Sequence, residues 1–275
     1  SSGNCIYIGS ESTHILVDAG ISNKRIQQGL KEIGLKGEDL SGILITHEHS
    51  DHIRGLGVLA RKYGLPIYAT PGTIRELQGK KELGDYDGSL YCSVQPDCSF
   101  QVGDLKVLPF SIDHDAAQPV AYRVCCGRKQ VAVATDMGHF DSYIIEHLQE
   151  LDAILLESNH DVRMLETGPY PYPLKRRILG DHGHLSNENA GRLLTYILHE
   201  KIKKILLGHL SKENNYEELA YETVRLEIDH GDTPYTSRDF SISVAGRDRM
   251  SEIVYKKKNK KENSHEQSDY YRSWK

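Results

Sequence analysis

The segment 46–52 reads Thr-His-Glu-His-Ser-Asp-His and places three imidazoles and a carboxylate within six positions of one another. A hydrophobic core has no use for such a cluster. Neutral imidazoles suit zinc and similar ions, and a carboxylate adds the negative charge of a hydrolytic metal site. Because alternate residues of an extended turn point in opposite directions, we expect His47 and His49 to bind one ion, and Asp51 and His52 a neighbouring ion. A solvated polar loop is the alternative interpretation.

The elements on either side of this heptad position it on a turn. Residues 42–45 form an apolar run, which predicts a buried strand. After the heptad, apolar residues recur at helical spacing from Ile53 to Tyr63, which predicts a helix. The cluster is therefore expected on a strand-to-helix turn.

Five further apolar runs end in a residue that can bind a metal or transfer a proton. These residues are Asp18, His114, Asp136, Glu157 and His209. Taken singly, each is more typical of a helix cap or a hydrogen-bonded structural residue. Strand ends at one edge of layered sheets converge, however, so the recurrence predicts that these residues meet the heptad.

Predicted helices alternate with the strands. Capping residues followed by apolar residues at helical spacing place helix starts at Ser22, Asp141, Ser186 and Asn215. Strands and helices mixed over the whole length predict α/β layers rather than an all-β sandwich.

The organisation of the chain predicts one catalytic domain followed by a tail. No linker is evident before Val254, so the domain is expected over residues 1–255. Residues 256–275 begin with a lysine-rich stretch that cannot bury a core, and we expect a basic, disordered tail there. A phosphate-binding arm is the alternative role for this tail.

Charge and composition limit the function classes. The formal net charge of −5 over 275 residues argues against a broad basic face for nucleic acid, but not against a local basic groove. Five cysteines without a Cys-x-x-Cys pair predict neither a disulfide framework nor a cysteine metal site. The chain shows no apolar run of roughly 20 residues and no secretory leader. We therefore expect a cytoplasmic protein without a membrane partner.

The heptad resembles the His-x-His-x-Asp-His signature of the metallo-β-lactamase superfamily. Four other stretches are similar to the remaining motifs of that superfamily: residues 17–20, 113–115, 134–138 and 207–211. The resemblance covers almost all of residues 1–250 and implies a single-domain αββα four-layer sandwich. It also implies a role for each metal-site residue: His47, His49 and His114 would hold one ion, Asp51, His52 and His209 the other, Asp136 would bridge both, and Asp18 would support the metal loop.

These residue types suit a two-metal hydrolase without reference to a family. Two divalent ions roughly 3.5–4 Å apart can share a hydroxide and clamp a phosphoryl or carbonyl oxygen. Asp51 is expected to orient that bridging nucleophile. The mixed His and Asp ligands suit zinc or manganese, and also iron. No serine or cysteine nucleophile with a catalytic triad competes with this interpretation.

The spacing of the later motifs separates branches of the superfamily. Nucleases with a β-CASP domain insert it between the fourth and last motifs, and the interval from Asp136 to His209 is too short for that. Gly183-His184-Leu185-Ser186 looks like the histidine motif of ribonuclease Z, which implies that His184 is a general acid. A structural histidine beside a helix is the alternative. The chain lacks the Arg-Tyr after the last motif and the long arm of ribonuclease Z, so we do not expect transfer RNA processing.

Linked blocks are more similar to the bacterial YycJ/WalJ (VicX)-type exonuclease branch. These blocks are residues 3–5, 46–55, 157–161, 170–177 and 183–190. The resemblance implies a nuclease that trims DNA in the 5′-to-3′ direction during DNA repair.

A basic and aromatic segment supplies candidate substrate-binding residues. Arginines, a lysine and tyrosines between positions 158 and 183 suit phosphates and stacked bases, although tyrosines among prolines also cover ordinary hydrophobic edges. The candidates are His160, Lys175, Arg176, Arg177 and Ser186. His160 is equally suited to capping a turn.

The sequence is compatible with three functions. The first is a metal-dependent phosphodiesterase whose partner is nucleic acid, with DNA preferred. The second is a small-molecule hydrolase that opens a thioester or lactone. The third is a regulatory binding protein without turnover, which the intact ligand set at every motif argues against.

Overall fold

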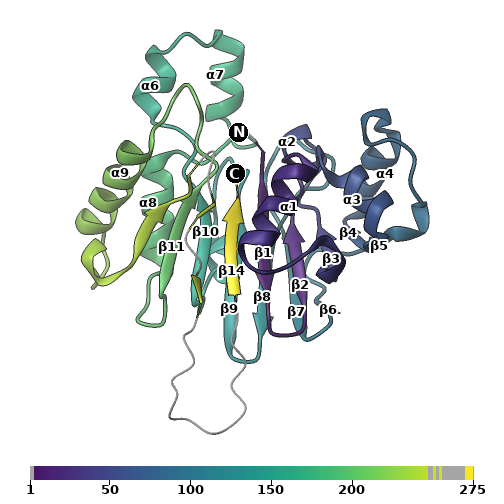
Figure 1. Cartoon of the computed structure of the whole chain (residues 1–275). Helices are drawn as coiled ribbons and strands as arrows, with labels where there is room; N and C mark the ends of the chain where they lie inside the picture. The colour runs from purple at the N-terminus through teal and green to yellow at the C-terminus, as the bar shows by residue number, and fades with distance from the viewer. Residues whose placement is uncertain (1–2, 247–249, 252–253, 256–269, 275) are drawn as a thin grey trace, which may run out of the picture.

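Two β-sheets lie face to face at the centre of the molecule, with helices on both outer faces (Figure 1). The computed structural model describes residues 3–246, 250–251, 254–255 and 270–274. Within these residues each sheet has seven strands. The first sheet has the order β13 (Val254–Tyr255), β14 (Tyr270–Trp274), β1 (Cys5–Gly9), β2 (His14–Val17), β3 (Gly42–Leu44), β4 (Ile67–Ala69) and β5 (Tyr91–Ser93). The second has the order β12 (Ile242–Val244), β11 (Lys204–Gly208), β10 (Ala153–Glu157), β9 (Lys129–Ala134), β8 (Val120–Cys126), β7 (Leu105–Ser111) and β6 (Phe100–Val102).

The helices divide between the two sheets. The first sheet is accompanied by α1 (Asn23–Glu32), α2 (Ser50–Ile53), α3 (Leu56–Tyr63) and α4 (Pro71–Gly79), and the second by α5 (Ser142–His147), α8 (Asn187–Ile197) and α9 (Glu217–His230). Two more, α6 (Val162–Thr167) and α7 (Tyr172–Leu179), project together at the top of Figure 1. Short 3₁₀ turns lie at Gly37–Asp39, Lys81–Leu83, Gly88–Leu90 and Ser237–Asp239. None of the helices in the described ranges is long and apolar enough to span a bilayer.

Alternation along the strands builds three separate layers of core. In β10, Ile154 and Leu156 pack on the outer helices, whereas Ala153 and Leu155 pack between the sheets. The strands of the first sheet do the same, and a third cluster joins their outer side chains to α1 and α3. Because successive strand side chains point to opposite faces, two apolar faces on each sheet require four layers. The predicted αββα sandwich is confirmed.

Strand direction brings the motif-bearing strand ends to one edge. β2 and β3 are parallel, and so are β9, β10 and β11. β7 and β9 are each antiparallel to β8, so these two strands also run in one direction. The predicted convergence at this edge, drawn at the top of Figure 1, therefore follows from the topology.

Three of the four predicted helix starts are confirmed, since the cap side chains accept backbone hydrogen bonds: Ser22, Asp141 and Ser186. The fourth, at Asn215, is wrong. Helix α9 begins at Glu217, and the buried Asn215 amide donates instead to the carbonyls of Ser158 and Asn159, at 2.9 and 3.0 Å. Those buried carbonyls need a donor, and satisfying them outweighs capping a helix that solvent can reach.

The predicted tail differs from the structure at its end. Tyr270–Trp274 form β14, which pairs antiparallel with β1, so these five residues belong to the first sheet. Their aromatic, β-favouring composition explains the difference, whereas the prediction rested on the lysine-rich stretch before them. The rest of the predicted tail, 256–269 and 275, lies outside the described residues.

Candidate metal centre

The heptad spans the loop after β3 and the start of α2, and other main-chain segments hold it in place. The Asn4 N–H donates to the Asp51 carbonyl at 2.7 Å, and the Ala19 N–H to the His52 carbonyl at 2.8 Å. Gly20 packs directly against the loop. A Cβ at this position would lie only 1.6 Å from the Asp51 carbonyl oxygen. The loop geometry therefore depends on segments far from the heptad in sequence.

Asp18 holds the loop in place through hydrogen bonds. Its fully buried carboxylate accepts the Thr46 N–H at 2.9 Å and the Thr46 hydroxyl at 2.8 Å. The same carboxylate accepts from His52 Nδ1 at 2.7 Å. Because this carboxylate holds Nδ1, His52 Nε2 faces Asp51 and Asp136, and it also lies 2.9 Å from the Asn4 side-chain amide.

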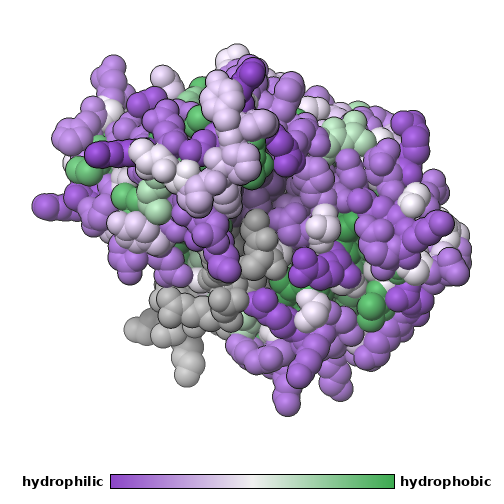
Figure 2. Space-filling view, turned by 90° about the horizontal axis from the view of Figure 1, so that it is seen from above, coloured by the Kyte–Doolittle hydropathy of each residue, from purple (hydrophilic) through white to green (hydrophobic). Residues whose placement is uncertain are grey.

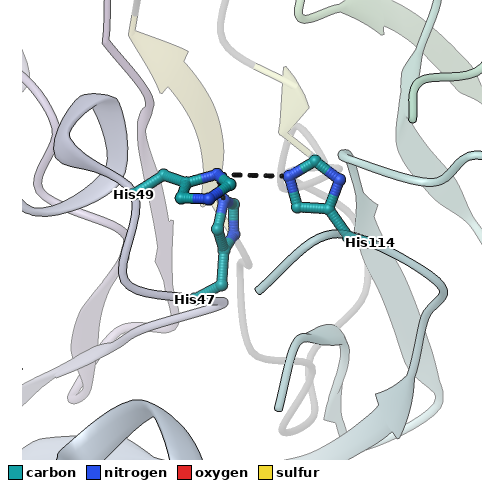
Figure 3. A group of neighbouring side chains, drawn as sticks. All are labelled: His47, His49 and His114. Carbon is teal, nitrogen blue, oxygen red and sulfur yellow. Dashed lines mark hydrogen bonds between the residues drawn. The ribbon is translucent and has the colours of Figure 1, made fainter. Parts of the chain in front are cut away.

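The first group of candidate ligands is His47, His49 and His114, whose rings gather at one point (Figure 3). His49 Nδ1 lies 3.1 Å from His47 Nε2 and 3.3 Å from His114 Nε2. Two rings come from the heptad and the third from the loop after β7. His114 Nδ1 donates to the Gly183 carbonyl at 3.1 Å, which turns its Nε2 toward the other two rings.

The second group is Asp51, His52 and His209. Asp51 Oδ2 lies 3.8 Å from His52 Nε2 and 3.7 Å from His209 Nε2. His209 comes from the end of β11, so this group also joins the two halves of the fold.

Asp136 lies between the two groups. Its Oδ2 is 3.3 Å from His52 Nε2, and its Oδ1 is 3.4 Å from His209 Nε2 and 3.7 Å from His114 Nε2. Asp18, Asp136 and His209 all adopt left-handed backbone conformations, with φ of 61°, 62° and 57°. Such conformations cost about 1–3 kcal/mol each and mark positions that the surrounding structure enforces.

The electrostatics of these side chains suit divalent cations. Burial lowers the pKa of His47 and His114, which keeps both imidazoles neutral and able to act as ligands. Burial disfavours the charged form of Asp136, but His209 and His52 outweigh it and hold the pKa of this carboxyl well below its usual range. Burial disfavours the protonated form of His52, but opposing charges, that of Asp136 foremost, raise the pKa of this ring to about 10. A buried anionic carboxylate beside imidazoles is a donor set that fits zinc, manganese or iron, and an ion that binds His52 displaces the proton of that ring.

Glu157, at the end of β10, organises the other side of the centre. Its fully buried Oε1 accepts from His209 Nδ1 at 2.6 Å and from His184 Nδ1 at 2.9 Å. Oε2 accepts the backbone N–H of Met137 and Leu185 at 2.9 and 3.1 Å. In the sequence Glu157 is recognisable as a strand end, and its spacing predicts no particular role. One carboxylate thus orients a candidate metal ligand and the candidate general acid.

His184 lies at the side of the centre with 21% of its side chain exposed. Its Nδ1 is held by Glu157, which leaves Nε2 free to face a substrate. Burial disfavours the protonated ring, but the Glu157 carboxylate outweighs this effect and raises the pKa of His184 above its ordinary value. The raised pKa favours the protonated ring, which is the form that can donate a proton.

Part of this centre opens into a pocket of about 350 Å³. Figure 2, which views this end of the molecule, shows a hollow among mostly hydrophilic side chains. From the predicted set, the pocket is lined by His49, Asp51, Asp136, Arg177, His184 and His209. Arg54 and Asn159 also line it, and neither was predicted from the sequence. Asn159 donates to the His209 carbonyl at 2.8 Å and so supports a candidate ligand.

Of the predicted substrate-binding residues, Arg177 alone reaches this pocket. Arg176 is exposed on α7 and does not line it. The Lys175 ammonium donates to the carbonyls of Glu166 and Gly168, at 2.7 and 2.8 Å, and so ties α7 to the end of α6.

Ser186 and His160 do not line the pocket. The Ser186 hydroxyl accepts the Asn189 N–H at 3.2 Å as the cap of α8. His160 is 1% exposed, and burial lowers its pKa to about 4. Both lie behind the pocket surface, at the parallel bridge that joins residues 160 and 186.

Comparison with known proteins adds to this geometry. The family described as "Beta-lactamase superfamily domain" matches residues 13–209. The chain is 44% identical over 232 residues to "Exodeoxyribonuclease WalJ" of Streptococcus pneumoniae (strain D39), covering 84% of this chain and 86% of that protein. It is 42% identical over 224 residues to "Exodeoxyribonuclease YycJ" of Bacillus anthracis, covering 82% and 84%.

More distant similarities agree with this fold. A ribonuclease Z of Methanopyrus kandleri is 29% identical over 125 residues, covering 43% of this chain and 42% of that protein. The crystal structure of the metallo-beta-lactamase fold protein YhfI from Bacillus subtilis superposes with a TM-score of 0.63 at 19% identity, over 88% of this chain and 89% of that one. At this identity the likeness concerns the fold alone.

Proposed function

The chain belongs to the beta-lactamase superfamily, and from this premise we propose that it is a metal-dependent exodeoxyribonuclease acting in the 5′-to-3′ direction in cytoplasmic DNA repair. The observation that carries the proposal is the 44% identity, over 84% of the chain, to a protein named exodeoxyribonuclease. The convergence of His47, His49, Asp51, His52, His114, Asp136 and His209 in adjoining clusters, four of which line the pocket, supports the hydrolytic chemistry.

We assign one divalent ion to His47, His49 and His114 and a second to Asp51, His52 and His209, with Asp136 serving both. Zinc and manganese suit these ligands, and so does iron. When bound, such ions supply a nucleophile at neutral pH and neutralise charge on the phosphoryl oxygens.

The chain's own residues carry the rest of the proposed mechanism. Asp51 is partly exposed to the pocket, and its carboxylate accepts a hydrogen bond from the attacking water and orients it. His184 donates the proton on Nε2 to the 3′ oxygen that leaves when the P–O bond breaks. Glu157 keeps the His184 ring oriented and charged until that transfer.

The test is incubation of the full chain with manganese or zinc and 5′-phosphorylated DNA and RNA, each single- and double-stranded. Thioester and lactone substrates are assayed in parallel. We expect mononucleotides to be released from the 5′ end of DNA, with labels near the 3′ end retained until late in the digestion.

Variants link any activity to this site. Asp51→Ala should lower the rate by about a hundredfold or more if it orients the nucleophile. Hydrolysis of the thioester or lactone without nucleotide release would replace the proposal with the small-molecule alternative. Nucleotide release that Asp51→Ala leaves unchanged would remove Asp51 from the mechanism.

A further inference from the structure

Arg54 occupies a rigid corner directly after the heptad. It ends α2, the short helix that carries Asp51, and its N–H donates to the Ser50 carbonyl at 3.1 Å. The next residue, Gly55, donates to the Ala19 carbonyl at 2.7 Å, and a Cβ at Gly55 would lie 2.4 Å from the Ile21 oxygen. The backbone from which this arginine projects is therefore fixed relative to the metal loop.

The side chain of Arg54 is exposed and lines the pocket. Within the part of the chain that the structure describes, no carboxylate pairs with its guanidinium. Arg192 and Arg225, by contrast, are paired with carboxylates of neighbouring side chains. A guanidinium left unpaired beside a cluster of candidate metal ligands is available to an anionic ligand.

Arg177 lines the same pocket from the other half of the fold. It projects from α7, and its Nε donates to Asp115 Oδ2. Asp115 Oδ1 in turn lies 3.5 Å from His114 Nε2 and 3.9 Å from His49 Nε2. The ion pair uses the Nε edge of the guanidinium and leaves the terminal nitrogens as donors, because arginine has five N–H groups.

The size of the pocket determines what these arginines can reach. A volume of about 350 Å³ is near the lower end of the range for small-molecule sites, roughly 300–1,000 Å³. A nucleic acid strand must therefore continue across the rim on which both arginines lie. Guanidinium groups bind phosphates through paired hydrogen bonds, and a strand presents a phosphate on each side of the scissile one. A thioester or lactone presents none.

We propose that Arg54 and Arg177 form a clamp for the two phosphates that flank the scissile phosphate, one arginine for each. The proposal rests on the proposed function and refines it. For an enzyme that acts at a 5′ end, one flanking phosphate is the terminal 5′-phosphate. The clamp therefore selects 5′-phosphorylated strands and requires a charged phosphate downstream of the cleaved bond.

The experiment removes each flanking charge separately. One DNA substrate has a 5′-hydroxyl in place of the terminal 5′-phosphate, and another has a neutral methylphosphonate at the first phosphate downstream of the scissile bond. We expect each change to lower kcat/KM of the unaltered enzyme about ten- to a hundredfold, as for a lost charge-assisted hydrogen bond. In Arg54→Ala the decrease in kcat/KM caused by one of the two substrate changes should disappear. In Arg177→Ala the decrease caused by the other substrate change should disappear. With lysine at either position, removing the corresponding phosphate charge should again lower kcat/KM, but by less than with arginine.

Binding provides a readout that does not depend on turnover. In a His184→Ala background, the salt dependence of Kd for a single-stranded DNA should fall by about 0.7 in logarithmic slope for each lost arginine contact. Arg128→Ala is the matched control, because this exposed arginine lies in the β8–β9 turn at the opposite end of β9 from Asp136. Its slope should equal that of the background.

The outcomes separate the two proposals. If Arg54→Ala cleaved DNA and both substrate changes still lowered its kcat/KM, the clamp would be overturned and the proposed function would stand. Loss of the same decrease in both arginine variants would also overturn the clamp, since the two residues would then share one phosphate. Failure of the unaltered enzyme to cleave any DNA would overturn the proposed function and the clamp together.

Discussion

The charged side chains on the floor of the pocket are buried, whereas those on its rim are exposed to solvent. On the floor, Asp136 and His209 are each 2% exposed, and Asp136 Oδ1 lies 3.4 Å from His209 Nε2. On the rim, the side chain of Arg177 is 56% exposed, and Arg54 is also exposed. Buried charges interact strongly but tolerate no missing partner, whereas exposed charges are screened by solvent and salt. The floor is therefore expected to decide whether the reaction occurs, and the rim which substrate is used.

Removing the metal or its shared ligand should give the largest effect. We expect a chelator to abolish DNA cleavage, and Asp136→Asn to lower kcat at least about a thousandfold, because several kcal/mol of transition-state stabilisation depend on this group. Single-turnover assays with titrated manganese or zinc measure the loss, and calorimetry measures metal binding. An Asp136→Asn enzyme with near-normal cleavage and metal stoichiometry would contradict the assignment of this residue to the floor.

The next largest effect is expected at His184. His184→Ala should lower kcat about a hundredfold to ten-thousandfold, the usual range for a lost general acid. His182→Ala is the control, because this nearby histidine has 69% of its side chain exposed and does not line the pocket. Restoration of the rate by a substrate whose leaving group needs no proton would support the assignment. An equal loss with both substrates would indicate a structural role instead.

Glu157→Gln should have an intermediate effect that depends on pH. The Glu157 carboxylate raises the pKa of His184 against the opposing effect of burial, so the ring keeps its proton to higher pH. Cleavage should then fall only when the pH rises through that raised value. Without the carboxylate charge the alkaline limb should move to lower pH, and the rate should drop about ten- to a hundredfold. If the alkaline limb of the kcat–pH profile stayed at the same pH, Glu157 would not control the protonation of His184.

The rim should give the smallest effect and the one most sensitive to salt. Arg177→Ala is expected to raise KM for DNA about tenfold at low ionic strength, and the difference from the unaltered enzyme should shrink as salt is added. The neighbouring Arg176→Ala should change KM less, because Arg176 does not line the pocket. If the Arg177→Ala defect persisted in high salt, Arg177 would belong energetically with the floor.

The floor was predictable from the sequence because its signal is local and repeated. The heptad holds four of the candidate ligands within six positions, and each remaining ligand follows an apolar run that predicts a strand. The α/β layering followed from the same alternation and the four-layer αββα arrangement from the family resemblance, and both are confirmed. The rim was predicted poorly, because an exposed arginine on a helix has no pattern that distinguishes it from an ordinary solvated charge. Arg54 was missed for this reason.

Polar residues with several available partners were also predicted poorly. Asn215 was predicted to cap a helix, but its side-chain amide donates to two buried carbonyls instead. Ser186, proposed as a substrate contact, caps α8 through the same hydroxyl. Choosing between such roles depends on which unsatisfied groups lie nearby, and those neighbours come from distant parts of the chain.

The sequence by itself determined the types of side chain available, the strands that carry them and the α/β layering, because these depend on local spacing and side-chain alternation. The tertiary structure decided which side chains share a partner. It placed Glu157 between His184 and His209, and it set Arg54 and Arg177 on the same pocket from opposite halves of the fold. Such pairings depend on how the two sheets pack, and packing is a property of the whole chain rather than of any segment.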